Sequence, residues 1–270
     1  MPNEEWQFFI LYHYCLSMKK RLIAAMLAVG SCGILFAQTR VIAHRGYWDC
    51  EGAAQNSITA LVKSAEAGVY GSEFDVSITA DGVPVVNHDD DIQGHVIETS
   101  RYADIKDLKL PNGETLPTLE QYLVKGKELG GVQLILEIKP HKQEANEDRA
   151  VKAIVALVRK HGLEKRVDYI SFSMNICKEL VKEAPGAPVY YLNGDVAPEE
   201  LKELGIAGAD YHYKVFKKHP EWIKEARELG LKTNSWTVDD TDMMQWLIDQ
   251  KVDFITTDKP VELKQLLEKK

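Results

Sequence analysis

The chain has 270 residues, of which 45% are hydrophobic and 27% are charged, and its formal net charge is −8. This length allows one large domain or two small ones, and the apolar content is ample for a core. A nucleic-acid-binding protein would carry a basic patch or stripe, so the acidic balance argues against that class.

The first 37 residues are typical of a targeting segment. A basic triplet at 19–21 precedes an apolar run from Leu22 to Ala37 that is short for a membrane span. We therefore expect cleavage after Ala37, export to the periplasm or the medium, and no transmembrane span in the mature chain. Met18 directly precedes the triplet, so residues 1–17 fit an upstream extension from a misassigned start.

The cysteines leave two questions open. The alternative to cleavage after Ala37 is a lipoprotein signal, in which Cys32, after Val29-Gly30-Ser31, carries the lipid. The apolar stretch 33–37 that follows Cys32 disfavours this alternative. Cleavage after Ala37 would leave Cys50 and Cys177. Two cysteines can pair in an oxidising compartment, but the sequence does not show whether these two lie close together.

From Arg40 onwards, short β-type runs alternate with amphipathic helical patterns. The expected strands are Val41–Gly46, Ser72–Thr79, Val132–Lys139, Val167–Phe172, Pro188–Asn193, Ala209–Tyr213, Leu231–Val238 and Val252–Thr257. The expected helices are Ser57–Ala67, Thr118–Leu129, Glu147–His161, Met174–Ala184, Pro198–Leu204, Pro220–Leu229, Thr241–Gln250 and Val261–Lys270. Eight strands alternating with helices predict an α/β fold, the TIM (β/α)8 barrel. An open doubly wound sheet is the alternative, but no Gly-rich phosphate fingerprint follows the first strand.

We expect residues 38–270 to form a single barrel domain with one long connection, about 80–117, after the second strand. That connection holds a hairpin, a short helix near Ala103–Leu108 and a Pro-Asn-Gly turn at 111–113. Long insertions between a barrel strand and its helix usually lie at the rim of the active site.

The second strand carries two acids. Glu73 and Asp75 are two residues apart, so in an extended chain they point to one side and can reach the same ion. The turn at 80–82 then reverses the chain into a short apolar run that brings His88 back towards the acids. This pattern predicts a metal site with an acid/base group beside it, and its alternative is a solvated edge hairpin.

Further polar residues lie near the carboxyl ends of other strands, where barrel enzymes place their catalytic groups. The first strand ends in His44-Arg45-Gly46, and the third carries Glu137 and Lys139 on one face. Trp236 lies near the end of the seventh strand, where it either lines a substrate pocket or closes the barrel. His95, His141, His161, His212 and His219 have no motif context, so we expect structural or surface roles for them.

Five pieces in order make the resemblance specific: His-Arg-Gly at 44–46, Gln-Asn-Ser at 55–57, Glu-x-Asp at 73–75 with the segment up to His88, Glu-Ile-Lys at 137–139, and Trp-Thr-Val at 236–238. Together they resemble the glycerophosphodiester phosphodiesterase family over about residues 41–260. The resemblance implies a TIM barrel that uses a divalent cation to cleave glycerophosphodiesters into sn-glycerol 3-phosphate and an alcohol.

The resemblance also implies roles for individual residues. Metal ligation is implied for Glu73, Asp75 and Glu137, and acid/base roles for His44 and His88. Carboxylates without histidine ligands favour Ca²⁺ or Mg²⁺ over Zn²⁺. Arg45 and Lys139 are expected to hold the phosphate oxygens, with Gln55 and Trp236 as further substrate-binding residues.

One position departs from the family pattern. Gln55 stands where the family usually has a glutamate, so it keeps the hydrogen-bonding shape but loses the charge that would compensate Arg45. A barrel that binds a phosphorylated ligand without turnover is therefore one alternative, although both histidines and all three acids are retained. The other alternative is a related phospholipase that acts on intact lipids and would need an apolar docking face. The oligomeric state is unknown from the sequence.

Overall fold

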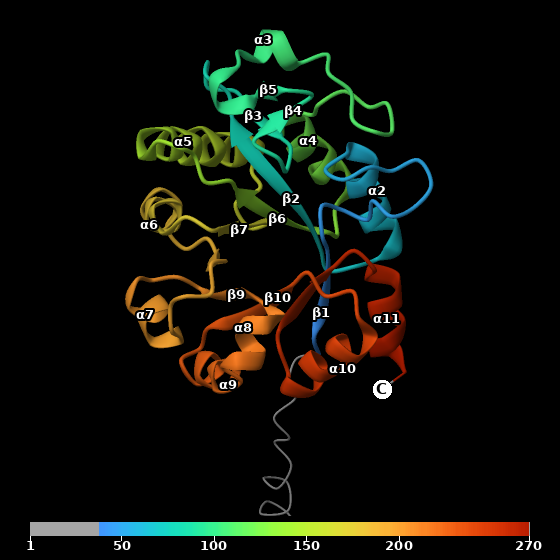
Figure 1. Cartoon of the computed structure of the whole chain (residues 1–270), viewed down its shortest axis with the longest axis vertical. Coiled ribbons are helices and arrows are strands. Elements are labelled where there is room, and N and C mark those ends of the chain that lie inside the picture. The colour runs from blue at the N-terminus through green and yellow to red at the C-terminus, as the bar shows by residue number, and fades with distance from the viewer. Residues whose placement is uncertain (1–37, 270) are drawn as a thin grey trace, which may run out of the picture. The chain divides into compact units, whose positions relative to one another are not determined.

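The computed structural model describes residues 38–269, which form a closed barrel of eight parallel strands (Figure 1). The strands are β1 Arg40–Ala43, β2 Gly71–Ile78, β6 Gln133–Ile138, β7 Val167–Ser171, β8 Val189–Tyr191, β9 Gly208–His212, β10 Lys232–Trp236 and β11 Phe254–Thr257. Each pairs with the next along the chain, and β1 also pairs with β11, which closes the ring. The predicted TIM barrel is confirmed, and the strand bounds lie close to the expected ones.

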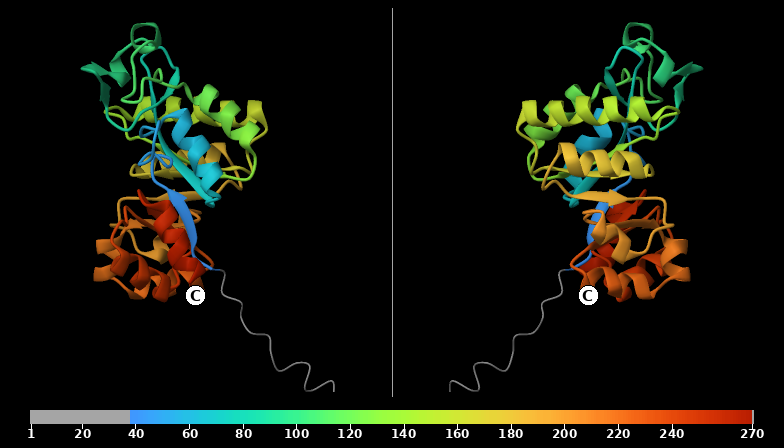
Figure 2. Two further views of the ribbon diagram at one scale, coloured as in Figure 1. Left: turned by 90° about the vertical axis from the view of Figure 1, so that its right-hand side faces the viewer. Right: turned by 90° about the vertical axis from the view of Figure 1, so that its left-hand side faces the viewer.

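Helices follow the strands and surround the ring (Figure 2). They are α2 Ile58–Ala67, α4 Leu119–Leu129, α5 Glu144–His161, α6 Met174–Glu183, α7 Pro198–Glu203, α8 Tyr213–Lys218, α9 Glu221–Glu228, α10 Thr241–Gln250 and α11 Pro260–Glu268. Local chemistry fixes several ends. Ser57 caps α2, which ends at a left-handed Gly68, and Thr118 forms a capping box with Gln121 on α4.

Helix α8 is the barrel helix that the sequence pattern does not predict, because the expected strand ran on to Tyr213. In the structure β9 ends at His212, whose ring Nδ1 accepts a hydrogen bond from the backbone N–H of Lys214 and so caps α8. The helix has only six residues, Tyr213–Lys218, which is too short for a helical period to show in the sequence. Its N-cap is a histidine, which is not among the residues that usually mark a helix start.

Two apolar layers hold the barrel together. One lies between the strands and the helices, and the other fills the interior of the ring with the buried side chains of Ile42, Ile135, Ile170, Tyr190, Leu192 and Phe254. Because side chains fill the interior, the barrel is a packed core rather than a pore. A ligand can therefore enter only at an end of the ring.

The connection after β2 folds as a small layer of its own at the carboxyl end of that strand (Figure 1). It contains β3 Pro84–Val86, antiparallel to β2, the β4 Asp91–Ile92 and β5 His95–Val96 hairpin, the 3-10 turn η1 Ile97–Thr99, and α3 Tyr102–Ile105. Its own buried cluster comprises Ala54, Val85, Ile92, Ile97, Ile105, Leu110 and Leu116. Hydrogen bonds from α5 fix this layer to the barrel, because Arg149 donates to the carbonyl of Ala80 and Asn146 donates to Glu98.

The predicted signal segment, residues 1–37 with Cys32, lies outside the described residues, so its cleavage and the export of the chain stay predictions. Within residues 38–269, none of the helices combines the length and the apolar character needed to cross a bilayer. Cys50 and Cys177 are both free, and Cys177 is buried.

Candidate active site

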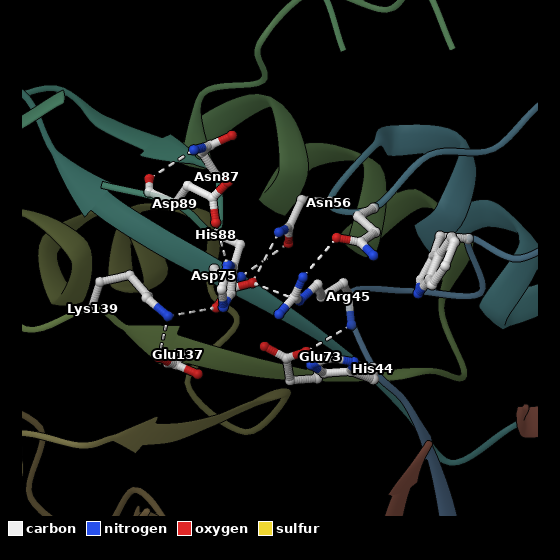
Figure 3. Close-up of polar contacts among 12 residues, drawn as sticks. His44, Arg45, Asn56, Glu73, Asp75, Asn87, His88, Asp89, Glu137 and Lys139 are labelled. Carbon is white, nitrogen blue, oxygen red and sulfur yellow. Dashed lines mark hydrogen bonds and ion pairs between the residues drawn. The ribbon is translucent and has the colours of Figure 1, made fainter. Parts of the chain in front are cut away.

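Three carboxylates from two neighbouring strands meet at the carboxyl end of the barrel (Figure 3). Strands β2 and β6 pair in parallel with Asp75 opposite Glu137, and Glu73 lies two residues before Asp75 on the same face. Their ligand oxygens all lie within 4.8 Å of one another, and all three residues are buried. The predicted convergence of these acids is therefore present in the structure.

The electrostatics of this triad are unfavourable without a compensating positive charge. Burial, together with the neighbouring Asp75 and Glu137, raises the pKa of Glu73 well above its usual range. Burial and Asp75 likewise raise the pKa of Glu137 to about 7. Oxygen Oε1 of Glu73 is buried and has no hydrogen-bond partner. Burial acts to raise the pKa of Asp75 as well, but the charge of Lys139 lowers it overall. Glu73 and Glu137 are therefore the acids that require a bound proton or a bound cation.

The residues present fit a hard divalent cation. The donors are all carboxylate oxygens with no histidine or cysteine among them, which is the set that Ca²⁺ and Mg²⁺ prefer. The unpartnered Oε1 of Glu73 supplies a ligand atom that no protein group uses.

Two basic side chains flank the acids. The Lys139 ammonium lies 2.9 Å from Glu137 Oε1 and 3.2 Å from Asp75 Oδ1. Burial acts to lower the pKa of Lys139, but the two acids raise it overall, so the ammonium stays charged. Arg45 lies 3.8 Å from Asp75 through Nε and donates from Nη1 to Gln55 Oε1 at 2.6 Å. Gln55 thus keeps the hydrogen bond that the sequence analysis expected, without adding a negative charge.

His44 is held by a carboxylate from the opposite end of the chain. Its Nδ1 lies 2.9 Å from Asp258 Oδ1, which also accepts a hydrogen bond of 2.8 Å from Trp48 Nε1. Burial acts to raise the pKa of Asp258, but the bonds from His44 and Trp48 lower it overall, so the carboxylate is charged. An ionised partner on Nδ1 fixes the ring and leaves Nε2 to act on a ligand in the cavity that His44 lines.

His88 follows β3 and faces the acids from the other side. Its Nδ1 lies 2.7 Å from Asp89 Oδ1, and its side chain is 38% exposed, against 19% for His44. Burial lowers the pKa of His88, and Asp75 offsets this only in part. A neutral imidazole is therefore the main form at pH 7.

Backbone geometry around Arg45 and Asn56 is specialised. Both have left-handed φ values, 54° and 61°, which few residues other than glycine adopt. The turn brings the backbone N–H of Arg45 to within 2.7 Å of Glu73 Oε2. It also places Asn56 to donate to Asp75 Oδ2 and to accept from the backbone N–H of Asp75. Strain of this kind is maintained where a site requires the conformation.

Two cavities open onto these groups. The inner one has a volume of about 110 Å³ and is lined by the acid triad, both histidines and an apolar wall that includes Phe172, Leu192 and Trp236. The outer one, about 660 Å³, runs from Arg45 and His88 past Trp48 and Gln55 to Leu110 and Pro111. An inner and an outer space joined at Arg45 and His88 suit the two halves of a substrate on either side of a reacting centre.

The comparisons with known proteins agree with this geometry. Residues 44–262 match the sequence profile of the Glycerophosphoryl diester phosphodiesterase family. The chain belongs to this family. It is therefore a phosphodiesterase that hydrolyses glycerophosphodiesters.

Individual members of the family support the assignment. A glycerophosphodiester phosphodiesterase from Caldanaerobacter subterraneus is 30% identical over 86% of this chain and 99% of its own length. The crystal structure of one from Parabacteroides distasonis superimposes with a TM-score of 0.85 at 52% identity, over 86% of this chain and 98% of that chain. A phosphodiesterase from Oleispira antarctica, solved with the product sn-glycerol-3-phosphate, shares the fold with a TM-score of 0.72 at 24% identity, over 86% of this chain and 97% of that chain.

In this glycerophosphodiester phosphodiesterase, all nine residues that the sequence analysis selected line one or both of the two cavities. Trp236 lines the inner cavity and donates from Nε1 to the carbonyl of Asp210 at 2.8 Å. Sequence reasoning missed three neighbours, Asn56, Asp258 and Asp210. The sequence could have indicated two of them, because Asn56 belongs to the Gln-Asn-Ser motif at 55–57 and Asp258 directly follows the last strand. Nothing in the sequence around Asp210 distinguishes it.

Proposed function

We propose that this phosphodiesterase depends on a divalent cation, releases sn-glycerol 3-phosphate and an alcohol, and uses His44 and His88 as its acid/base pair. The observation that carries the proposal is the buried acid triad, with its unpartnered Glu73 oxygen, beside two histidines in one cavity. Glu73, Asp75 and Glu137 would hold Ca²⁺ or Mg²⁺. When bound, the cation supplies positive charge that offsets the negative charge of the phosphodiester and of its transition state.

Arg45 and Lys139 bind the phosphate oxygens in this mechanism. Their cationic groups lie on either side of Asp75, so a phosphate above the triad meets both of them. Arg45 offers a planar fork of donors and Lys139 a point charge. The hydrogen bond from Arg45 to Gln55 keeps the guanidinium in place without cancelling its charge.

The two histidines divide the proton transfers. One imidazole removes a proton from the attacking hydroxyl, and the other gives a proton to the departing alkoxide. Asp258 holds His44 in a fixed orientation, and Asp89 does the same for His88 at the open side of the site. Family resemblance implies that the glycerol 2-hydroxyl attacks first and that water then opens the cyclic phosphate.

Product identity and location complete the proposal. The structural relative solved with sn-glycerol-3-phosphate supports the same product here. The basic triplet and apolar run in residues 19–37 support export. N-terminal sequencing of the intact protein from the producing cells would test it, and we expect the sequence to begin at Gln38. Unprocessed protein that stays in the cell interior would contradict export.

The experiment for the activity is an assay of glycerol 3-phosphate release from soluble glycerophosphocholine, with Ca²⁺ or Mg²⁺ added and with a chelator. We expect release that requires the cation, and no comparable release from an intact phospholipid. The described chain exposes few large apolar side chains, Val96 and Val124, which leaves little surface to dock on lipid. Binding of glycerol 3-phosphate without turnover of any glycerophosphodiester would instead identify a binding barrel.

A further inference from the structure

One buried acid in the inner cavity lies outside the triad. Asp210, on β9, is 2% exposed and lines the cavity. Its Oδ1 has no hydrogen-bond partner, and within residues 38–269 no lysine, arginine or histidine forms an ion pair with it. Asn234 is its register partner on β10, and the Oδ1 of that residue is also buried without a partner.

Such an arrangement is unfavourable for the fold by itself. Burial raises the pKa of Asp210 to about 7, and the neighbouring Asn234 offsets this only in part. Two unpartnered buried oxygens each cost free energy that an apolar pair at the same positions would not cost. The cation of the triad does not account for Asp210, because the acids that gather within 4.8 Å are Glu73, Asp75 and Glu137.

The side chains around Asp210 determine what kind of ligand group fits beside it. Phe172, Leu192 and Trp236 form an apolar wall of the same cavity, and the interior layer with Ile170 and Tyr190 closes the space beneath. Trp236 donates a hydrogen bond to the backbone carbonyl of Asp210, which orients its ring. The space therefore accepts a small group whose C–H surface packs on the apolar wall and whose end carries a hydrogen-bond donor for Asp210.

The two cavities differ in a way that assigns the halves of the substrate. The inner cavity has a volume of only about 110 Å³, whereas the outer one has about 660 Å³ and is lined by both polar and apolar residues. Every glycerophosphodiester has the same small glycerol half, while the alcohol varies in size. The small cavity fits the constant half, and the outer one fits the variable half.

We propose that Asp210 accepts a hydrogen bond from the terminal hydroxyl of the glycerol half and thereby selects substrates with a free hydroxyl at that carbon. This inference rests on the proposed function and deepens it. A site built to bind a hydroxyl strongly rejects an analogue that lacks it, because its own polar groups are then left unpaired. An acyl chain on the same hydroxyl would remove the donor and would be too large for a cavity of about 110 Å³.

The test compares two phosphocholine diesters, one of glycerol and one of propane-1,2-diol. The second keeps the 2-hydroxyl and lacks only the terminal one. For the wild-type enzyme we expect kcat/KM to favour the glycerol diester by about 100-fold or more. For Asp210→Leu we expect this preference to fall below about 10-fold, and for Asp210→Asn, whose amide oxygen still accepts, an intermediate value.

Leu192→Val is the matched control, because it enlarges the same cavity without touching the acceptor. It should lower kcat/KM for both diesters by similar factors and leave their ratio unchanged. A preference in Asp210→Leu and Asp210→Asn equal to that of the wild type would overturn the inference, as would a wild-type enzyme that does not distinguish the diesters.

A binding measurement separates this inference from the proposed function. Calorimetric titration with sn-glycerol 3-phosphate and with propane-1,2-diol 1-phosphate reports the role of Asp210 without turnover. Loss of all hydrolysis with a retained, Asp210-dependent preference in binding would refute the proposed function alone. Equal affinity of the wild-type protein for both phosphates would refute the role of Asp210 even in an active enzyme.

Discussion

The two sides of the cavity are built on opposite principles. Strands β1, β2 and β6, with the residues that directly follow them, line one side of the cavity with titratable and charged groups, namely His44, Arg45, Glu73, Asp75, Glu137 and Lys139 (Figure 3). Strands β7 to β10 contribute a mostly apolar wall with one acid, Asp210. In the proposed function, the first side holds the charged groups that act on the phosphodiester, and the second side shapes the cavity. Substitutions on the charged side should therefore change catalysis, and substitutions on the other side should change substrate selectivity.

The largest effect should come from the charged side. Glu73→Gln keeps the shape of the side chain but removes a negative charge from the triad, so we expect loss of the cation and a fall in kcat of about 1,000-fold or more. Calorimetric titration with Ca²⁺ and an activity assay measure the two effects. Glu228→Gln, on the exposed surface of α9, is the control and should change neither. Cation-dependent activity within a few-fold of wild type in Glu73→Gln would remove the triad from the mechanism.

The histidines rank next. His44→Ala and His88→Ala should each lower kcat by about 100- to 10,000-fold, the range typical of general acid/base groups. Circular dichroism and calcium titration should remain close to wild type, because neither ring belongs to the triad. A variant that keeps near-normal turnover would show that its histidine takes no part in proton transfer.

The carboxylates behind the two histidines sharpen the comparison. Asp258 is partly buried and also accepts a bond from Trp48, so Asp258→Asn should lower kcat by about 10- to 100-fold and shift the pH profile. Asp89 is 78% exposed, and Asp89→Asn should cost only a few-fold. Steady-state kinetics across pH 5–9 would show which substitution lowers kcat more. A larger loss in Asp89→Asn than in Asp258→Asn would mean that His88, and not His44, depends on its carboxylate partner.

The stability of the cation-free protein should depend on pH through the buried acids. Burial raises the pKa of Glu137 and of Asp210 to about 7 each, so both acids keep a proton in the fold that the unfolded chain has already released. Their contribution is fully present below about pH 4 and is lost as the pH rises through 7, by up to about 4 kcal/mol for each group. Thermal denaturation in chelator should show this loss, and added Ca²⁺ should stabilise more at pH 8 than at pH 6. A chelated protein that becomes more stable between pH 5 and 7 would contradict the assignment.

The smallest effect concerns Gln55. Gln55→Glu restores a charge beside Arg45, so the guanidinium would be partly neutralised and would hold the phosphate less strongly. We expect KM to rise by a few-fold and the pH optimum to move, with little change in kcat. Assays with glycerophosphocholine and glycerophosphoethanolamine would reveal whether the change also alters the preferred alcohol. An unchanged KM for both substrates would show that the charge at position 55 does not affect substrate binding.

The charged side could be predicted from the sequence, whereas Trp236 was the one residue of the other side that could be. Glu73, Asp75 and Glu137 show a two-residue period on strands, and the parallel register then brings them together. The contact of Asp258 with His44 joins residues 214 positions apart, so it depends on the closure of the ring rather than on any local pattern. Asp210 is a single acid within a strand, and only its burial without a partner distinguishes it.

The backbone at Arg45 and Asn56 was also beyond sequence reasoning. Nothing in the residue types signals a left-handed φ at an arginine, because tertiary contacts with Glu73 and Asp75 impose it. Gly46 has a different explanation. A Cβ at this position would lie 2.7 Å from the Cβ of Ala60, so the last residue of the His-Arg-Gly motif must be glycine for steric reasons.

The most direct test of the central claim is a crystal structure of the protein soaked in Mn²⁺, with anomalous data collected for wild type and for Glu73→Gln. The account predicts one strong anomalous peak in the wild type, in contact with the carboxylates of Glu73, Asp75 and Glu137, and its loss in the variant. A peak elsewhere in the barrel, or a peak that persists unchanged without the Glu73 carboxylate, would contradict it.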